Sequence, residues 1–343
     1  MKIESGKIKN LLDFFKIENK KILLITSKNI SKKVDIKVLI KNLKKKNIVE
    51  ISNFIRAGAF LQDLNKLYKF TLPNLIIAIG GGSVIDISKA LSCTFYEKKI
   101  HDRFENKVKL LVIPTLSGTG SECSKGAILQ YKNGTKFALR SKKLIPNFIF
   151  YDFKLCLSAP KKLRVEALFD CLSHAIETYI SKKTNLLNKA RSIYVIKKIL
   201  KLNTRNIDSI KNQKIITNCS YLMGKNLVAG TTCLPHRIQY SLSMYSNSTH
   251  AQGIIALYKG WLLLINNSKS FKILEKKVCN RGKKLIDIIN NFKIRMKINY
   301  NLETLKVNLG EINNISLKTK GTLDNDPIYK NIDTIKNILH NSL

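Results

Sequence analysis

Four residues between positions 170 and 250 have the types and the spacing of a metal site. Asp170 and His174 stand four apart in LFDCLSHAIE, so a helix would carry both on one face, one turn apart. His236 and His250 follow, fourteen residues from each other. One aspartate and three histidines supply one oxygen and three nitrogen ligands, a set that suits Fe(II) or Zn(II) and leaves room for a substrate oxygen. Taken singly, each histidine could equally be an ordinary core or surface residue.

Two glycine-rich turns each follow a predicted strand. Gly80-Gly81-Gly82-Ser83 comes directly after the apolar run LIIAI, and PTLSGTGSE covers residues 114–122 after the run LLVI. Glycines let a backbone approach a diphosphate, and the N-terminus of a following helix offers free N–H groups. The spacing is not the GxGxxG of the Rossmann fingerprint, so a standard Rossmann domain is not predicted. Two turns at the carboxyl ends of parallel strands predict a shared phosphate-binding crevice; the alternative is a tight turn without a ligand.

The apolar pattern that must position these residues changes near residue 158. Before it, short β-branched runs alternate with amphipathic stretches, which predicts βαβ units and a parallel sheet. The predicted strands cover residues 21–26, 48–51, 75–79, 110–113 and 148–151, and residues 127–131 and 136–140 form a predicted hairpin appended to that sheet. After it, a period of 3.6 predicts helices over residues 161–182, 187–202, 213–229, 249–265 and 271–292. We therefore predict an α/β domain over residues 1–158 and an all-α domain over residues 159–343.

The charge of the chain is large but carries little functional information. The 343 residues include 61 Lys plus Arg and 23 Asp plus Glu, a formal net charge of +38. Of these 61 basic residues, 52 are Lys and only 9 are Arg. The chain also contains 46 Ile and 33 Asn, and Lys, Ile and Asn all have AT-rich codons. Arg is the residue for bidentate contacts to bases and phosphates, so its scarcity argues against a nucleic-acid partner. We interpret the charge as compositional drift on a solvated surface.

Other classes of protein are also excluded. Hydrophobic residues make up 44% of the chain, which is too many for a disordered protein. No apolar run approaches the roughly 18 residues of a membrane span, and the N-terminus lacks the apolar core of a signal peptide. The seven cysteines contain no CxxC pair, so neither a zinc knuckle nor a disulfide framework is indicated. We expect a soluble, cytoplasmic protein without a membrane partner.

Taken in order, these motifs resemble those of the iron-containing (group III) alcohol dehydrogenases. GGGSVIDISK at residues 80–89 is similar to the family's GGGSxxDxxK, PTLSGTGSE to PTTxGTGSE, and DCLSHAIETY at residues 170–179 to DAxxHAIExY. The family's third and fourth ligands, two histidines separated by thirteen residues, fall on His236 and His250. The resemblance covers nearly the whole chain. It implies the dehydroquinate synthase-like fold: a dinucleotide-binding α/β domain with a parallel sheet, an all-α metal-binding domain, and a cleft holding metal and nicotinamide.

The resemblance also implies an activity and a set of site residues. The chain would be a metal-dependent NAD(P)H-linked alcohol dehydrogenase or aldehyde reductase that transfers hydride to a small aldehyde or ketone. Fe(II), or alternatively Zn(II), would bind to Asp170, His174, His236 and His250. Gly81, Gly82 and Ser83 would cradle the diphosphate, Asp86 and Lys89 would contact or position the nicotinamide ribose, and Thr115 and Thr119 would line the nicotinamide. Ser27, Ser117 and Lys136 complete the cofactor-binding residues that we predict.

The sequence departs from the family's pattern at two positions. Where relatives usually carry a second histidine facing nicotinamide and substrate, this chain has Tyr240, so Tyr240 or a water would deliver the proton. Where many NAD-preferring members place an aspartate after the first strand, this chain has Thr26-Ser27-Lys28. Ser27 would not repel a 2′-phosphate and Lys28 could pair with it, so we predict NADPH over NADH.

Residues next to His236 suggest a substrate class. Arg237 and the pair Thr231-Thr232 could give the site a positive wall for an anionic tail such as that of phosphonoacetaldehyde. The stretch GTTCLPHRIQY is similar to that of phosphonoacetaldehyde reductases, and the length of 343 residues is close to that of maleylacetate reductases. Arg237 could instead face outward or form an interdomain salt bridge. An alternative function is that of a cousin with other chemistry, a polyol-phosphate dehydrogenase or a dehydroquinate-synthase-like cyclase. We expect a homodimer or larger homo-oligomer.

Overall fold

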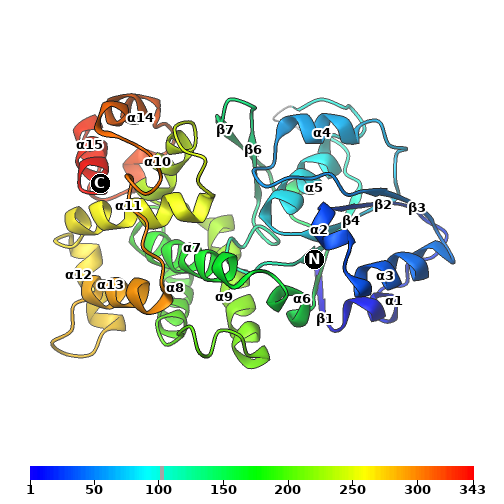
Figure 1. Ribbon diagram of the computed structural model, residues 1–343, viewed down its shortest axis with the longest axis horizontal. Coiled ribbons are helices and arrows are strands. Elements are labelled where there is room, and N and C mark those ends of the chain that lie inside the picture. The colour runs from blue at the N-terminus through cyan, green and yellow to red at the C-terminus, as the bar shows by residue number, and fades with distance from the viewer. Residues whose placement is uncertain (101–103) are drawn as a thin grey trace. The chain divides into compact units, whose positions relative to one another are not determined.

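The computed structural model describes residues 1–100 and 104–343 and divides into two compact units. Unit 1 comprises residues 1–132 and 136–160, and unit 2 comprises residues 133–135 and 161–343. The sequence places the domain boundary after residue 158, and the main division of the structure lies after Pro160. Figure 1 shows the strands gathered in unit 1 and helices alone in the larger part of unit 2.

Unit 1 contains a six-stranded sheet in which every neighbouring pair is parallel, as predicted. In spatial order the strands are β1 (Lys2–Ser5), β8 (Phe148–Tyr151), β5 (Lys109–Pro114), β4 (Leu75–Gly80), β2 (Lys21–Thr26) and β3 (Ile48–Ser52). The central strand β4 is buried along its whole length, which is why its sequence LIIAIG is a continuous apolar run. The edge strand β1 was not predicted, because only Ile3 in KIES is apolar.

Helices cover both faces of this sheet. Side chains alternate along each strand, so Leu23 and Ile25 of β2 face one cluster while Ile22 and Leu24 face the other. The first cluster includes residues of α4 (Leu61–Leu67) and α5 (Gly82–Thr94), and the second includes residues of α1 (Leu11–Phe14) and α3 (Val34–Lys44). In Figure 1, α4 and α5 lie above the sheet and α1 and α3 below it. The remaining short helices of unit 1 are η1 (Ile8–Asn10), α2 (Lys28–Ser31), η2 (Lys142–Leu144) and α6 (Phe153–Leu157).

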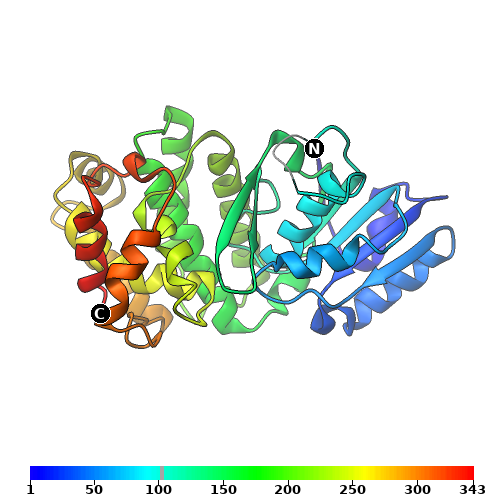
Figure 2. The ribbon, with the colours of Figure 1, turned by 90° about the horizontal axis from the view of Figure 1, so that it is seen from above.

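The predicted hairpin is present, but its predicted attachment to the parallel sheet is wrong. β6 (Gly126–Gln130) and β7 (Lys136–Arg140) pair antiparallel and form a sheet of their own, visible as the long green ribbon in Figure 2. The strand before the hairpin is β5, and both of its edges are already occupied, by β4 and β8. No edge next to β5 is therefore left for the hairpin to extend.

Unit 2 is built of helices, which confirms the predicted all-α class. They are α7 (Lys161–Ile180), α8 (Leu186–Ile199), α9 (Ile210–Ala229), α10 (Leu234–Leu242), α11 (His250–Ile265), α12 (Lys269–Val278), α13 (Leu285–Met296), η3 (Leu309–Glu311), α14 (Ile312–Lys318), η4 (Leu323–Asn325) and α15 (Ile332–His340). α7 is the central helix: every residue from Arg164 to Ile180 is buried, and α8, α9 and α11 pack against it. Figure 1 shows α7 among these helices.

One predicted helix proved to be two. The single helix predicted over residues 271–292 is broken between Val278 and Leu285, where α12 ends and α13 begins. Gly282 in this break has a φ of +82°, a left-handed conformation that a helix cannot contain. The apolar pattern continues across the break because Phe271 and Ile289 pack into the same core.

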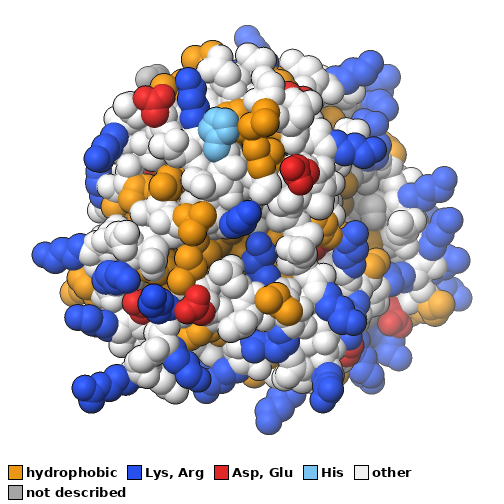
Figure 3. Space-filling model, turned by 60° about the vertical axis from the view of Figure 1, so that its left-hand side comes forward, with side chains coloured by type: hydrophobic (Ala, Val, Ile, Leu, Met, Phe, Trp, Pro, Cys, Tyr) orange, Lys and Arg blue, Asp and Glu red, His pale blue; other side chains and the backbone are white. Residues whose placement is uncertain are grey.

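The surface and the cysteines agree with the composition. Lysine and arginine side chains are spread over the face shown in Figure 3, with few acidic side chains between them. All seven cysteines are free thiols. Within residues 1–100 and 104–343, no helix has both the length and the apolar character needed to cross a membrane.

Candidate functional site

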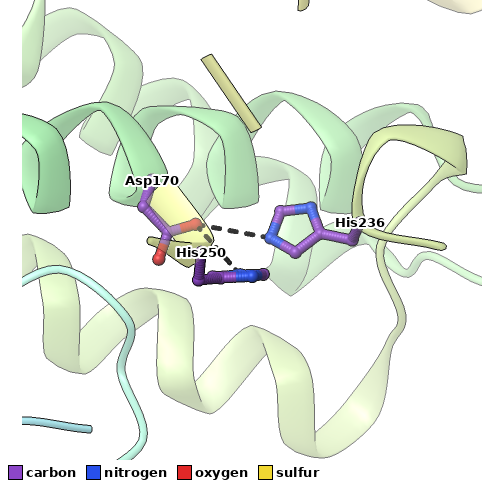
Figure 4. Close-up of side chains that lie close together, drawn as sticks. All are labelled: Asp170, His236 and His250. Carbon is purple, nitrogen blue, oxygen red and sulfur yellow. Dashed lines mark ion pairs between the residues drawn. The ribbon is translucent and has the colours of Figure 1, made fainter. Parts of the chain in front are cut away.

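Three of the four predicted metal ligands lie together in unit 2. Asp170 is in the middle of α7 and only 1% exposed, His236 lies in the first turn of α10, and His250 is the first residue of α11. One ligand atom from each lies within 4.8 Å of the others. Nε2 of His236 is 3.4 Å from Oδ1 of Asp170, and Nε2 of His250 is 3.7 Å from the same oxygen. Figure 4 shows both imidazoles directed at the carboxylate.

The two histidines are held by the way their helices begin. α10 starts with Pro235 in its first turn, and the N–H of Leu234 donates to Oδ2 of the buried Asp326 over 3.0 Å. α11 starts with a capping box, in which Thr249 and Gln252 satisfy each other's backbone N–H groups. Each histidine therefore stands on a helix start that is fixed by specific hydrogen bonds.

The second nitrogen of each imidazole has a dedicated acceptor. Nδ1–H of His236 donates to both oxygens of Glu177 at 2.9 Å, and Nδ1–H of His250 donates to Oε1 of Gln239 at 2.6 Å. These bonds select the tautomer in which Nε2, the nitrogen nearer Asp170, can be a ligand. Sequence reasoning assigned no role to Glu177 or Gln239. For Glu177 a signal existed, since it lies seven residues after Asp170 and three after His174, on the same face of the helix as both.

The atoms that face one another lack hydrogen-bond partners. Among the described residues, neither oxygen of Asp170 accepts a hydrogen bond, and Nε2 of His236 makes none. Burying a carboxylate without donors is costly, and a divalent cation between these atoms would satisfy all of them at once. The residues therefore fit the Fe(II) or Zn(II) that their types predict.

The electrostatics of the cluster point the same way. Burial acts to raise the pKa of Asp170, but His174, His250 and His236 together hold it below its usual range. Burial acts to lower the pKa of His236, but Glu177 and Asp170 outweigh it and raise the pKa to about 9. Protonated His236 thus lies between two carboxylates, those of Glu177 and Asp170, and a bound cation would take the place of the proton on Nε2.

His174, the fourth predicted ligand, is close to the others but not part of the group of three. Its ring stacks on that of His236, with centroids 4.5 Å apart and planes 23° apart. Burial lowers the pKa of His174 to about 4, so the imidazole is neutral. In the part of the chain that the structure describes, its buried Nδ1 has no hydrogen-bond partner. Ligation by His174 stays a prediction.

In unit 1 the two glycine turns lie side by side. β4 and β5 are neighbours with Gly80 opposite Pro114, and the N–H of Thr115 donates to the carbonyl of Gly80 at 3.0 Å. A Cβ on Gly82 would lie 3.7 Å from the side chain of Thr119, so the turns face each other closely. A Cβ on Gly80 would lie 2.5 Å from Cβ of Val84, and therefore only glycine fits there. The following helix, α5, is the one whose N-terminus was predicted to meet the diphosphate.

Asp86 and Lys89 of α5 form hydrogen bonds with the second turn and with the residues that follow it. The ammonium of Lys89 is fully buried and donates to the carbonyls of Ser121 (2.9 Å), Ser124 (3.0 Å) and Gly126. Asp86 accepts from the hydroxyl of Ser121 and from the N–H of Ile128, the latter at 3.0 Å. Of the two predicted roles, contact with the ribose or positioning, these bonds support positioning. Contact with the ribose stays a prediction.

The hydroxyls predicted to meet the cofactor also have partners. Ser83 Oγ accepts from the N–H of Gly58 at 2.9 Å, and Thr119 Oγ1 accepts from the N–H of Ser121 at 3.2 Å. Each of these two hydroxyls keeps its own hydrogen, which a ligand oxygen could accept. The other predicted residues of this turn, Thr115 and Ser117, are buried, and the hydroxyl of Ser117 donates to Sγ of Cys156 at 3.8 Å.

Three more residues of unit 1 bear on the cofactor prediction. Ser27 directly follows β2 and precedes the first residue of α2, the exposed Lys28. Its side chain makes no capping bond to α2. Lys136 begins β7, and burial lowers the pKa of its ammonium to about 8.

Tyr240 and Arg237 lie on α10 beside the predicted metal ligands. The ring of Tyr240 is 6.4 Å from that of His250, and the guanidinium of Arg237 lies 5.4 Å from the centre of the Tyr240 ring. Arg237 is only 6% exposed, so it does not face outward. Its guanidinium donates to Thr232 Oγ1 at 2.6 Å. Among the described residues, its Nε has no hydrogen-bond partner, and no carboxylate lies within ion-pair distance of it. Arg237 is thus a buried positive charge without an acidic partner among residues 1–100 and 104–343.

Known proteins resemble this chain in sequence and in fold. Residues 1–153 match the family model "Iron-containing alcohol dehydrogenase". An alcohol dehydrogenase of Thermococcus barophilus is 35% identical over 143 residues, 38% of each chain. A 4-hydroxybutyrate dehydrogenase of Clostridium kluyveri is 31% identical over 160 residues, 45% of this chain and 43% of the relative. The aligned part therefore spans less than half the length of these curated relatives.

Solved structures extend the likeness to the whole chain. The NADH-dependent butanol dehydrogenase A of Thermotoga maritima has a TM-score of 0.85 at 19% identity, covering 100% of this chain and 96% of that one. The sulfoacetaldehyde reductase of Bifidobacterium kashiwanohense, solved with NAD⁺, has a TM-score of 0.86 at 18% identity, covering 99% and 96%. At such identities the likeness establishes the fold. The family model matches residues 1–153, which include both glycine turns, and the solved structures show that the whole chain has the fold of iron-containing alcohol dehydrogenases.

Proposed function

We propose that the protein is a metal-dependent, NAD(P)H-linked alcohol dehydrogenase that interconverts small aldehydes or ketones and their alcohols. The observation that carries this proposal is the group of three ligand atoms within 4.8 Å, contributed by Asp170, His236 and His250. When bound, Fe(II) or Zn(II) would act as a Lewis acid on a carbonyl oxygen, and a reduced nicotinamide would supply the hydride. Relatives named as alcohol and butanol dehydrogenases support the same chemistry.

The chain's own residues have distinct tasks in this proposal. Glu177 and Gln239 hold the two imidazoles in the ligating tautomer, and His174 is the fourth ligand. The amides at the start of α5 and the hydroxyl of Ser83 bind the diphosphate. The phenol of Tyr240, whose ring lies 6.4 Å from that of His250, would deliver the proton that the developing alkoxide requires, in place of the histidine that relatives carry.

We propose NADPH as the preferred cofactor. The positions after β2 hold Ser27 and the exposed Lys28, with no carboxylate to repel a 2′-phosphate. Relatives are named for either nucleotide, a NADPH-dependent and a NADH-dependent butanol dehydrogenase among them. The ratio of kcat/KM for NADPH and NADH tests this: it should exceed one in the parent and fall in Lys28→Glu. A parent that prefers NADH contradicts the proposal.

We further propose that the substrate carries an anionic tail. The buried guanidinium of Arg237 lacks a carboxylate partner among the described residues, and an anionic ligand would neutralise it. The guanidinium lies against the ring of Tyr240, and Arg237 directly follows His236 in the chain. The charge is therefore beside the proposed metal ligands. The names of two relatives, 4-hydroxybutyrate dehydrogenase and sulfoacetaldehyde reductase, denote anionic substrates. Phosphonoacetaldehyde is one candidate of this class.

One experiment tests the activity and the substrate class together. Protein stripped with a chelator and protein reconstituted with Fe(II) or Zn(II) would be assayed for NADPH oxidation with neutral aldehydes and with aldehydes bearing a carboxylate, sulfonate or phosphonate. Turnover should require the metal, and Arg237→Met should reduce the rate with anionic aldehydes only. Equal rates before and after chelation would show that the metal is not catalytic. Equal loss on both kinds of aldehyde would show that Arg237 does not select the tail.

A further inference from the structure

A second group of polar residues lies one helical turn from the metal ligands. Glu166, which is 1% exposed, stands four residues before Asp170 on α7. Its Oε1 accepts from Nε2 of Gln252 at 3.0 Å and from the hydroxyl of Tyr300 at 2.6 Å. Gln252 belongs to α11 and stands two residues after His250. None of these three residues has a task in the reaction proposed above.

Gln252 uses the two ends of its amide for different purposes. Oε1 accepts from the N–H of Thr249 at 3.0 Å, which closes the capping box at the start of α11. Nε2 reaches across to Glu166 on α7. His250 lies between Thr249 and Gln252 in the chain. The same side chain therefore both defines the helix start on which His250 stands and ties that start to the helix that carries Asp170.

We propose that Gln252 and Glu166 form a clamp that sets the position of His250 relative to Asp170 and thereby the affinity of the site for a divalent cation. His250 is the ligand that most needs such support. Its side chain is 33% exposed and it stands at a helix end, whereas Asp170 is buried within α7. The inference rests on the proposed metal site, and the clamp residues act through His250 as positioning residues.

The charge pattern of the clamp suggests a variant that breaks it and a second that restores it. Gln252→Glu keeps an oxygen for the N–H of Thr249 but places a carboxylate against Glu166. We expect the Kd for Co(II), used as the probe, to rise about 10-fold, with a changed visible absorption spectrum of the bound Co(II). The double variant Glu166→Gln/Gln252→Glu reverses donor and acceptor, and should return both Kd and spectrum close to the parent.

A matched control separates positioning from general loss of stability. Ser268→Ala removes the cap at the start of α12 in the same unit, where Ser268 Oγ accepts from the N–H of Phe271 at 3.3 Å. It should lower Tm without changing the Co(II) Kd or spectrum. If Gln252→Glu does not fold, Glu166→Ala breaks the clamp from the other side and should show the same loss of affinity.

The outcomes are distinguishable. Parent affinity and spectrum in Gln252→Glu or Glu166→Ala would overturn the clamp, as would a double variant that regains the parent Tm but not the Co(II) affinity. A parent protein that does not bind Co(II) would overturn the metal site itself, and the clamp with it.

Discussion

The two units each contain a buried group of polar residues, and the groups differ in how their atoms are satisfied. In unit 1, Lys89 donates to the carbonyls of Ser121, Ser124 and Gly126, in and just after the second turn. Asp86 accepts from Ser121 and Ile128. In unit 2, both oxygens of Asp170 and Nε2 of His236 have no hydrogen bond among the described residues. A buried group whose atoms are all hydrogen-bonded can hold the surrounding loops in place, and we call this group of unit 1 the frame. A buried group with unsatisfied atoms leaves those atoms available to a bound cation.

This contrast says where a ligand would be recognised in each unit. In unit 1 the side chains hold the loops, and the backbone amides and hydroxyls of the turns are the groups left to bind phosphate. In unit 2 the side chains themselves would be the metal ligands in the proposed site, and the residues behind them would orient them. Substitutions should therefore be of two kinds: those that abolish cation binding in unit 2, and those that destabilise the loops held by the frame in unit 1.

The largest effect is expected for His236→Ala. It removes the central ligand and leaves Glu177 and Asp170 without their shared partner, so turnover should fall by about 1,000-fold or more. Metal content measured by elemental analysis should fall with it, while NADPH binding, measured by fluorescence, should not change. The exposed His340 is the matched control, and His340→Ala should leave both turnover and metal content unchanged. Full metal content in His236→Ala would contradict the site.

Breaking the frame of unit 1 should cost stability. Lys89→Met removes a buried ammonium and leaves three carbonyls and Asp86 without it, so the free energy of unfolding should fall by about 3 kcal/mol. Urea denaturation measures this, with Lys142→Met at an exposed position as the control. NADPH affinity should weaken, because the second turn loses its support, while Co(II) affinity should stay at the parent value. A variant as stable as the parent would show that Lys89 is not part of a frame.

Orienting residues of the metal site should have an intermediate effect. Glu177→Gln keeps an acceptor for His236 but removes the negative charge behind the imidazole, so the Kd for Zn(II) should rise about 10-fold to 100-fold. A competition titration with a chromophoric chelator measures it. NADPH affinity serves as the internal control and should not change. If Zn(II) binds as tightly as in the parent, the hydrogen bond to Glu177 does not tune the ligand.

The smallest effect concerns pH and Lys136. Burial lowers the pKa of this ammonium to about 8 in the free protein, so it is largely protonated at pH 7 and loses its proton as pH rises. If Lys136 contacts the anionic cofactor, binding favours the protonated form and raises this pKa. NADPH affinity should then be greatest below pH 8 and fall several-fold between pH 8 and 10. Lys136→Met should remove that pH dependence, and an unchanged pH profile would exclude the contact.

The sequence predicted the parts of the fold whose signal is local. The run LIIAI and its neighbours identified the buried strands of a parallel sheet, because such strands need apolar side chains on both faces. The edge strand β1 was missed because it is largely exposed and its pairing with β8 depends on residues far along the chain. The break at Gly282 was missed because apolar periodicity reports which face is buried and not whether the helix is continuous.

The same distinction holds for the candidate site. Asp170 and His174 were predicted from spacing on one helix, but spacing could not show that His174 would stack on His236 outside the group of three. Gln239 and Gln252 were not predicted, because their roles exist only where α10, α11 and α7 meet. The hydrogen bonds of Lys89 were also not predicted, because sequence alone indicates a lysine at the surface or at a ligand and does not identify its backbone acceptors.

The pairing of β1 with β8 has a consequence for how the protein is made. The register joins residues 2–5 to residues 148–151, and the N–H of Ile8 donates to Asp152 over 2.8 Å, across 144 positions of sequence. A ribosome adding about 5 to 20 residues per second leaves the first strand waiting roughly 7 to 30 seconds for its partner. Until then β5 has an open edge on which another nascent chain could pair. A fragment ending before Phe148 should therefore aggregate. Once β8 has been synthesised and pairs with β5, that edge is covered and can no longer pair with another chain.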